Sequence, residues 1–130
     1  MKAILVYTIP GPPRTKKNSQ RMIQKNGRWI PIPSADYKEF EERAGFFIRK
    51  NGGPLSCRLE VTATFYMPTR RKVDLVNLLE AADDILVKYG VVADDNSDII
   101  VSHDGSRVAV DKHNPRTVIY IKKLEEEKCQ

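Results

Sequence analysis

The sequence predicts a single domain that combines short β-strands with two helices. At 130 residues the chain is long enough for one hydrophobic core and too short for two. In several short runs apolar residues alternate with polar ones, as in strands, whereas two longer segments repeat their apolar residues at helical spacing. The composition, 41% hydrophobic and 30% charged, is that of an ordinary soluble globular domain.

The charge balance favours a polyanionic partner. Lys and Arg number 22 against 17 Asp and Glu, which gives a net charge of +5 and a pI near 9.3. This excess indicates nucleic acid first and an acidic membrane surface second. No apolar run reaches the roughly 18–20 residues that a membrane span needs, and the N-terminal run is too short for a signal peptide. We therefore expect a cytoplasmic protein, without a disulfide between its two cysteines.

The chain is expected to begin with a strand and a basic loop. Residues 3–9 are aliphatic and β-branched, and Gly11-Pro12-Pro13 ends this strand. Residues 14–21 then read Arg-Thr-Lys-Lys-Asn-Ser-Gln-Arg. Such a segment is either a solvated connection or a loop that contacts phosphates, because its cations, amides and hydroxyls suit a nucleic-acid backbone. Lys16 and Lys17 are the candidate phosphate contacts.

A β-hairpin is predicted next. Two runs, 21–24 and 28–32, flank an Asn-Gly pair, which is a strong short-range hairpin signal. Pro31 and Pro33 are expected to break the second strand. The basic residues of this hairpin and Trp29 could lie against a nucleic-acid backbone, but a core or interface position is the simpler interpretation for Trp29.

A helix and a strand follow the hairpin. Ser34 is a good N-cap, and apolar residues recur at helical spacing from about Ala35 to Lys50. Between Arg58 and Met67 apolar and polar residues alternate, which predicts a strand with one buried face. The next positive charges are candidate DNA contacts: Arg70, Arg71 and Lys72.

The strongest chemical signal lies between Asp74 and Asp98. This stretch has six Asp and one Glu against one Lys, a charge of −6 in a chain of +5. Because like charges close together repel, such density needs an explanation. The stretch is either a solvated helix face followed by an Asp-rich turn, or a carboxylate site for a divalent cation beside a surface that holds phosphates.

A helix from about Asp74 to Tyr89 separates these acids by face. At ~100° per residue its apolar residues share one arc, which is expected to be core. A neighbouring polar arc carries Asp74, Asn77, Glu80 and Asp84, whereas Asp83 is turned away from it. Glu80 and Asp84 are like charges at i, i+4, which mildly destabilise a helix that has no cation beside them.

The segment after this helix is predicted to be a turn followed by strands. Gly90 is suited to end the helix, and Asp94 and Asp95 then form an acidic turn that would meet Asp74 if the chain folds back. Strands are predicted at 99–102 and 107–110, joined as a hairpin by an Asp-Gly turn, and a last strand at 118–121. His103 beside that turn is a general base, a ligand or, more simply, a structural residue.

Several of these features occur together in one known family. They are Ile9-Pro10 with Pro12 and Pro13, Asn18-Ser19, Arg70-Arg71-Lys72, Asp74-Leu75-Val76-Asn77-Leu78, Asp84, Gly90 and Asp94-Asp95. With this set, in order and at close spacing over nearly the whole chain, the sequence resembles the RusA family of Holliday junction resolvases. These are small dimeric endonucleases common in phages and prophages. No single motif carries the resemblance.

The resemblance implies an α+β fold, with a mixed β-sheet and two main helices in one RusA-like domain over residues 1–130. It implies a homodimer that acts in DNA recombination and repair on branched DNA such as the four-way junction. The reaction it implies is Mg²⁺-dependent phosphodiester hydrolysis, with Mn²⁺ as a possible substitute, and no small-molecule substrate. It further implies that Asp74 and Asp95 are metal-binding catalytic acids.

Two positions depart from the family pattern. The best-known members carry a second Asp where this chain has Val76, and a Lys where it has Glu80. A valine cannot ligate a metal, and loss of the lysine removes a charge that could stabilise the reacting phosphate. We expect a rebuilt site, because Glu80 shares the polar arc. In it Asp74, Asp95 and Glu80 are the catalytic acids, Asp94 and Asp84 are further metal ligands, and Asn77 gives structural support.

Two alternatives stay open. The chain could bind branched DNA without cutting it, through a degenerate site, which Val76 and Glu80 support. It could also cut flaps or forks in place of four-way junctions. A small-molecule or metal-independent enzyme is not favoured, because the sequence has no Gly-rich phosphate loop, no Ser/His/Asp series and no Cys/His metal spacing.

Overall fold

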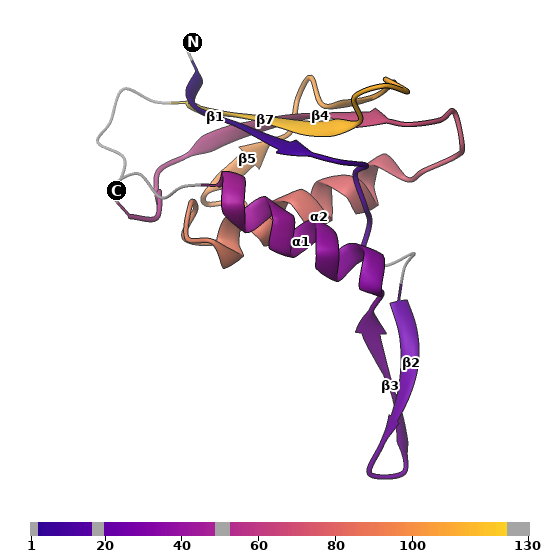
Figure 1. The fold of residues 1–130 in the computed structure, drawn as a ribbon. Helices are drawn as coiled ribbons and strands as arrows, with labels where there is room; N and C mark the ends of the chain where they lie inside the picture. The colour runs from indigo at the N-terminus through magenta and orange to yellow at the C-terminus, as the bar shows by residue number, and fades with distance from the viewer. Residues whose placement is uncertain (1–2, 17–19, 49–52, 125–130) are drawn as a thin grey trace.

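A mixed β-sheet and two helices form the body of the molecule, and a two-stranded hairpin projects from it (Figure 1). The computed structural model describes residues 3–16, 20–48 and 53–124. The predicted α+β fold, with a mixed sheet and two main helices, is confirmed. In the described part of the chain, neither helix has the length and apolar character needed to cross a membrane.

The sheet is built around β4 (Leu59–Met67). On one side β7 (Arg116–Lys123) pairs with it in antiparallel orientation, and β1 (Ala3–Pro10) pairs antiparallel with the far side of β7. On the other side β4 pairs in parallel with β5 (Ile100–Ser102) near its start and with β6 (Arg107–Val110) near its end. The sheet is therefore antiparallel on one side of β4 and parallel on the other.

The predicted hairpin over residues 99–110 is wrong. β5 and β6 both run along the same edge of β4 in the same direction, so the Asp-Gly turn lies in a loop that leaves this edge after β5 and returns to it at β6. Two hydrogen bonds hold this loop against β4: Thr62 Oγ1 donates to the Asp104 carbonyl at 2.9 Å, and the N–H of Ala63 donates to Ser106 Oγ at 3.0 Å. The Asp-Gly pair marked a turn correctly, but a turn does not fix the strand with which the chain pairs next.

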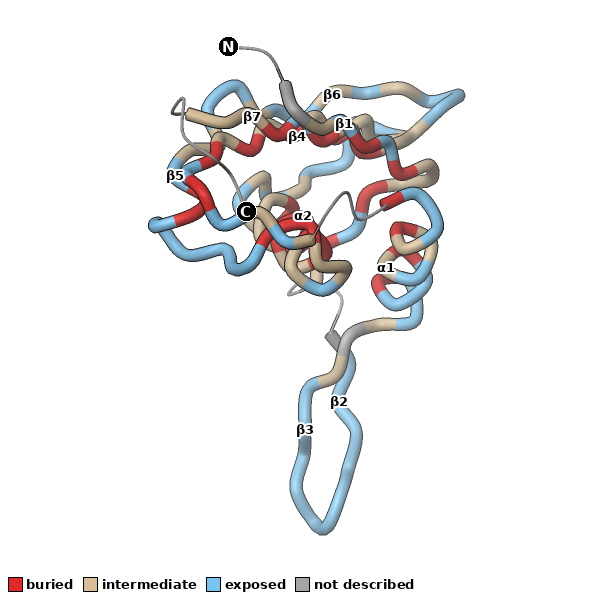
Figure 2. The backbone as a smooth tube through the Cα atoms, turned by 90° about the vertical axis from the view of Figure 1, so that its left-hand side faces the viewer, coloured by how far each residue is buried: buried red, intermediate tan, exposed pale blue. Residues whose placement is uncertain are grey.

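One face of the sheet is buried against both helices, α1 (Ala35–Phe47) and α2 (Leu75–Lys88), which lie side by side below it (Figures 1 and 2). The alternation predicted for β4 is confirmed, since every second side chain from Leu59 to Phe65 is buried. The sheet contributes to this core Tyr7, Ile9, Leu59, Val61, Ala63, Phe65, Ile119 and Ile121. The polar face of α2 is consequently the one directed away from the sheet.

Side-chain caps set the starts of both helices. The hydroxyl of Ser34 accepts a hydrogen bond from the N–H of Tyr37 at 3.1 Å, which confirms it as the N-cap of α1. Asp74 caps α2. Gly90 follows α2 with a φ of +72°, the left-handed conformation that glycine adopts without steric cost. Helix α1 ends at Phe47, earlier than the predicted Lys50.

Cys57 departs from the expectation for a reducing compartment. It is buried and disulfide-bonded, whereas no disulfide was predicted. The number of cysteines is informative about a compartment, and it does not report which thiols the fold brings together. Cys129 lies outside the described residues.

The predicted hairpin at Asn26-Gly27 is confirmed, as β2 (Gln20–Lys25) and β3 (Arg28–Pro33). Both turn residues have positive φ, +52° and +75°, as a type I′ turn requires. The expectation that Pro31 and Pro33 break the second strand is wrong. Hydrogen-bonded and non-hydrogen-bonded pairs alternate from the pair that closes the turn, so both prolines fall at positions where β2 needs no N–H donor.

Gly45 allows the ring of Tyr89 to lie against α1. A methyl group added at Gly45 would lie 2.8 Å from ring atoms of Tyr89, whose hydroxyl donates to the Glu41 carbonyl at 2.8 Å. We expect Gly45→Ala to lower the free energy of unfolding by about 1–3 kcal/mol through overpacking. Alanine in place of glycine within a helix would otherwise stabilise by roughly 1 kcal/mol. Equilibrium denaturation in urea measures the change.

The matched control is Gly45→Ala in a Tyr89→Ala background. With the ring removed, the added methyl meets no side chain there, so the alanine should stabilise. Equal destabilisation in both backgrounds would show that the contact with Tyr89 is not the reason for the glycine.

Candidate active site

Asp74 lies at the start of α2 and holds its first turn. Its Oδ1 accepts hydrogen bonds from the N–H groups of Val76 at 2.9 Å and Asn77 at 3.3 Å. A carboxylate at this position also interacts favourably with the positive end of the helix dipole. Among the described residues no further hydrogen bond or ion pair engages its second oxygen. Asp74 thus combines a structural role with one open carboxylate oxygen.

Helix geometry separates Asp74 from Asp84. Ten residues of α-helix rise about 15 Å. Two Asp side chains that each bind Mg²⁺ at about 2 Å cannot span that distance, so Asp74 and Asp84 cannot ligate the same ion. Glu80 lies between them, one turn before Asp84. The carboxylates of the polar arc therefore form a row along α2, in which Asp74 at the start of the helix is separate from Glu80 and Asp84.

Charges on α2 act on the acidic turn that follows it. The pKa of Asp95 is raised, first by loss of hydration, then by its hydrogen bond with Asp94 and by the negative charges of Asp83, Asp84 and Asp94. Repulsion of this kind is appreciable only between nearby carboxylates. Asp83 and Asp84 of α2 are therefore among the carboxylates whose charges act on Asp95.

Asp94 shapes the acidic turn. Its Oδ1 accepts a hydrogen bond from the N–H of Asp95 at 2.7 Å, and its Oδ2 accepts one from the side-chain amide of Asn96 at 3.2 Å. The amide oxygen of Asn96 in turn accepts from the N–H of Asp98 at 2.9 Å. Because both Asp94 oxygens already have donors within the turn, Asp95 is the better placed of the two for a cation.

Lys16 provides a cation beside Asp84. Its Nζ lies 3.6 Å from Asp84 Oδ2, and both side chains are partly exposed. This contact offsets the repulsion expected between Glu80 and Asp84. An ion pair in contact with water contributes little to stability, so it exchanges readily. Lys16 can consequently leave Asp84 when another cation or a phosphate approaches.

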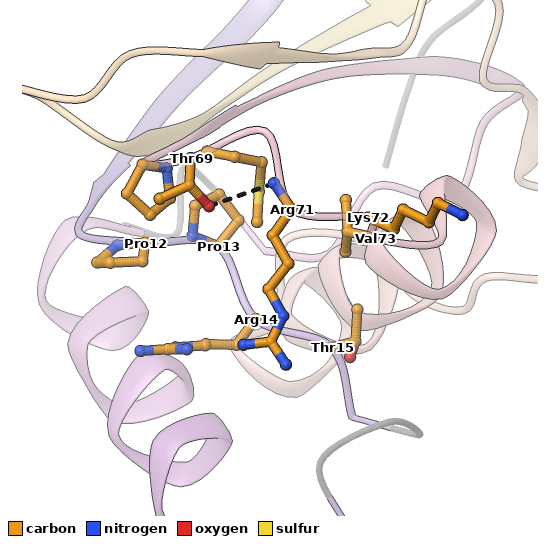
Figure 3. Close-up of a pocket in the computed structure, with 10 residues that line it drawn as sticks. Pro12, Pro13, Arg14, Thr15, Thr69, Arg71, Lys72 and Val73 are labelled. Atoms are coloured by element: carbon orange, nitrogen blue, oxygen red, sulfur yellow. Dashed lines mark hydrogen bonds between the residues drawn. The ribbon is translucent and has the colours of Figure 1, made fainter.

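A cationic pocket of about 360 Å³ lies beside the start of α2 (Figure 3). Residues 12–15, 67–69 and 71–73 supply its lining. The lining includes three cations, Arg14, Arg71 and Lys72, and no carboxylate. In Figure 3 the side chain of Arg71 extends toward Arg14 and Thr15. In the same view the side chain of Lys72 extends away from both arginines, so the guanidinium groups of Arg14 and Arg71, which have no described carboxylate partner, are the candidate ligands of an anion such as phosphate.

A single short segment connects this pocket to the carboxylates. Arg14 and Thr15 line the pocket, and the next residue, Lys16, contacts Asp84. Thr15 is buried, which fixes the segment between its two charged neighbours. The cationic pocket and the carboxylate of Asp84 are therefore joined by residues 14–16.

Asp83 and His103 form a pair on the buried side of α2. His103 Nε2 lies 2.8 Å from Asp83 Oδ2, and its Nδ1 lies 2.8 Å from the Val61 carbonyl. A carbonyl can only accept, so Nδ1 carries a hydrogen and the remaining proton is shared between Nε2 and Asp83. Asp83 is 7% exposed and its other oxygen has no described hydrogen-bond partner.

Both groups of this pair bind their proton more tightly than usual. Burial is the main cause of the raised pKa of Asp83, with the nearby charges of Asp84 and Glu80 adding to it. The hydrogen bond with Asp83 raises the pKa of His103 above its usual 6.5. His103 is therefore a structural partner of Asp83. The sequence carried only a weak signal for it, namely an Asp at the edge of an apolar helical arc.

The remaining predicted residues occupy varied positions. Val76 is 69% exposed in the first turn of α2, and Glu80 is half-buried. Arg70 is exposed and lies outside the lining of the pocket, unlike its two neighbours. Lys17 lies outside the described residues. Arg14 belongs to the basic segment 14–21, for which phosphate contact was one of two interpretations, but it was not singled out with Lys16 and Lys17.

In the described part of the chain, no three Asp, Glu, His or Cys side chains converge as a complete set of metal ligands. Mg²⁺ does not need such a set, since one or two carboxylates with waters and substrate phosphates commonly hold it. Asp84 and Asp95 fit that requirement. Loss of hydration is the main cause of the raised pKa of Asp95, the charge of Asp84 adds to it, and a divalent cation held by both carboxylates would relieve that repulsion.

One known protein family matches most of the chain. A family model described as Endodeoxyribonuclease RusA matches residues 10–122. The chain belongs to the RusA endodeoxyribonuclease family. A comparison with curated proteins gives no match. The part of the chain that matches the RusA model contains the cationic pocket, all of α2 and the acidic turn, so the surface described above lies within the region that characterises RusA nucleases, which act on branched DNA junctions.

The proton shared by Asp83 and His103 makes stability depend on pH. The pKa of His103 is higher in the folded than in the unfolded protein, so its contribution is complete below about pH 6.5 and is lost as the pH rises through the raised value. The raised pKa of Asp83 acts in the same direction, beginning above 3.8. We expect the free energy of unfolding of the metal-free protein to fall as the pH rises above 6.5, as measured by urea denaturation in EDTA.

His103→Asn should abolish this decline and cost about 2 kcal/mol at pH 6, because it leaves the buried Asp83 without its partner. His113→Asn is the matched control, since His113 is exposed. A decline that persists above pH 6.5 in His103→Asn would assign the effect to other groups.

Proposed function

We propose that the chain is a structure-specific endodeoxyribonuclease that hydrolyses phosphodiester bonds in branched DNA, with the four-way junction as its substrate and Mg²⁺ as its cofactor. The observation that carries the proposal is that residues 12–16 join the cationic pocket to the carboxylate of Asp84. Cleavage of a DNA backbone needs cations that hold its phosphates and carboxylates that hold a metal ion beside the reacting one. Membership of the RusA family supports the reaction class.

Asp84 and Asp95 would hold the ion, with Glu80 as a third carboxylate one helical turn from Asp84. A bound Mg²⁺ supplies Lewis acidity that lowers the pKa of an attacking water and offsets charge on the leaving oxygen. Mn²⁺ is expected to substitute. Asp94 holds the turn that carries Asp95, and Asn77 supports the start of α2 through its backbone N–H.

The cationic residues would position the DNA backbone. Arg14 and Arg71 would bind a phosphate in the pocket through their guanidinium groups, and Lys72, whose side chain extends away from them, would contact another part of the backbone. Lys16 is placed between this phosphate and the carboxylates. When a metal ion occupies Asp84, Lys16 loses its partner there and becomes free to contact the phosphate that reacts. Arg70, which is exposed and precedes the pocket residue Arg71, would add to the positive surface.

Asp74 would act at the pocket end of α2. It follows directly after Lys72 and Val73, which line the pocket, and its second carboxylate oxygen is open. It can hold an ion against the phosphate in the pocket while its first oxygen keeps the helix capped. This role is separate from that of Asp84, because the rise of the helix keeps their ligands apart.

We further infer a homodimer that acts on DNA in the cytoplasm. A four-way junction is cut on two strands, and two sites related by a two-fold axis match that requirement. Cuts at the two strands would resolve the junction during DNA recombination and repair, including that of prophage DNA.

A second candidate function is binding of branched DNA without cleavage. It is favoured by the exposed Val76, at the position where the best-known family members carry a carboxylate, and by the absence of three converging acids in the described residues. In that case the pocket and Lys16 would hold the DNA, and the carboxylates would only shape the surface. A protein that binds a junction tightly and leaves it uncut with Mg²⁺ or Mn²⁺ would support this function.

The carboxylates are tested by cleavage of a synthetic four-way junction. We expect Asp84→Asn and Asp95→Asn each to lower the single-turnover rate in Mg²⁺ by at least about 100-fold, because each removes a ligand of the ion. Junction binding in EDTA should change by less than about threefold. Asp98→Asn, in the same exposed turn, is the control and should cut at the wild-type rate. A fully active Asp84→Asn protein would contradict the assignment of that residue.

The pocket is tested by the salt dependence of binding. Arg14→Ala and Arg71→Ala should each weaken junction binding about tenfold and reduce the slope of log K against log salt by about 0.7–0.9, because each removes one phosphate contact. Lys112→Ala, an exposed cation outside the pocket lining, is the control. Unchanged slopes in both arginine variants would show that the pocket does not hold the backbone.

A further inference from the structure

The β2–β3 hairpin stands away from the body of the molecule and is exposed along its length (Figures 1 and 2). Every residue from Arg21 to Pro31 is exposed. Two strands with no further strand or helix behind them are at best marginally stable in water. The hairpin is therefore a segment whose two faces are available to a partner.

The register of the hairpin gives it two chemically different faces. Residues paired directly across the strands share a face, so Arg21, Ile23, Lys25, Arg28 and Ile30 lie on one. The opposite face is uncharged and carries Met22 and Trp29, which are 55% and 65% exposed. Residues 20–33 include no acidic residue. The interpretation of Trp29 as a core residue is therefore wrong.

The cationic face indicates an anionic partner. Lys25 is paired directly with Arg28 beside the turn, and like charges at such positions destabilise a hairpin. Among the described residues no carboxylate pairs with Arg21, Lys25 or Arg28. Arg21 and Lys25 are about 13 Å apart along the strand, which is close to twice the spacing of successive phosphates in a DNA strand. A polyanionic backbone would satisfy all three cations at once.

The opposite face indicates what else this partner offers. An exposed Trp side chain on a rigid ribbon stacks on a nucleic-acid base, and such stacking contributes about 1–3 kcal/mol. Bases within an intact duplex have no free face, whereas bases at a branch point can lose a stacking neighbour. Trp29 lies one pair from the turn, near the outer end of the ribbon, where it can reach such a base.

We propose that the hairpin is a DNA-binding arm, in which Arg21, Lys25 and Arg28 contact the phosphate backbone and Trp29 stacks on a base at the branch point. This inference rests on the proposed function only in taking branched DNA as the ligand. It adds that stacking of Trp29 is the contact by which the protein distinguishes a branch point from an intact duplex. A two-stranded β-ribbon has dimensions that fit a DNA groove, so the arm can follow the backbone to the branch.

Trp29 is the one tryptophan of the sequence, so its fluorescence reports on this arm alone. The full chain is titrated in EDTA with a synthetic four-way junction and with a duplex of the same length and sequence. We expect the junction to quench Trp29 emission and to protect it from acrylamide, and the duplex to do so much less. Trp29→Ala should weaken junction binding about tenfold and duplex binding by less than about twofold, whereas Trp29→Phe should restore most of the junction affinity.

The cationic face is tested with Arg21, Lys25 and Arg28 all changed to Gln. This variant should lower the salt slope of junction binding by about 2–3, in proportion to the three lost phosphate contacts. Its urea unfolding transition should match that of the wild type, because none of the three residues touches the core. An unchanged salt slope would overturn the backbone contact.

Three outcomes would contradict the DNA-binding role of the hairpin or distinguish it from the proposed hydrolysis. Equal quenching by junction and duplex would overturn the contact with a branch point. Protection of Trp29 without DNA, increasing with protein concentration, would show that the hairpin packs against a second copy of the chain and would overturn the arm. Specific protection by the junction, in a protein that cuts nothing in Mg²⁺ or Mn²⁺, would support the arm and overturn the proposed hydrolysis.

Discussion

The packing of α2 against the sheet determines where each acidic group of the molecule lies. Leu78, Ile85 and Leu86 are fully buried, and they leave the helix one rotational setting about its axis. In that setting Asp83 is directed into the structure, where His103 shares its proton, and its neighbour Asp84 meets Lys16 at the surface. A step of ~100° along the helix thus separates a structural aspartate from a candidate metal ligand.

The candidate site is organised by charges that are only partly compensated within the protein. The charge of Asp84 adds to the raised pKa of Asp95, and Lys16 contacts Asp84 only through a weak, exposed ion pair. The pocket shows the opposite imbalance, with three cations and no carboxylate in its lining. Under the proposed function, a divalent cation at the carboxylates and a phosphate in the pocket would compensate these two imbalances. The packing of α2 and of the segment around the buried Thr15 must offset the unfavourable free energy of holding these like charges close together.

The structure offers a physical interpretation of Val76 and Glu80, the two positions at which the chain departs from the RusA pattern. Val76 is exposed in the first turn of α2, where it neither ligates nor packs, so the start of the helix depends on Asp74 alone for a carboxylate. Glu80 extends the row of carboxylates toward Asp84. Both changes move the acidic groups from the start of α2 to its middle, beside the turn that carries Asp95. The hairpin adds further positive charge on a segment that projects from the body of the molecule.

The sequence by itself determined the features that depend on local periodicity and turn chemistry. They include the alternating burial of β4, the span of α2, the cap at Ser34 and the Asn26-Gly27 hairpin, because each follows from residues close together in the chain. The tertiary structure alone decided that β5 and β6 share the edge of β4, that His103 pairs with Asp83, and that Arg14 and Arg71 line one pocket. These contacts join distant segments, and neither a turn residue nor a helical arc encodes the surface against which it packs.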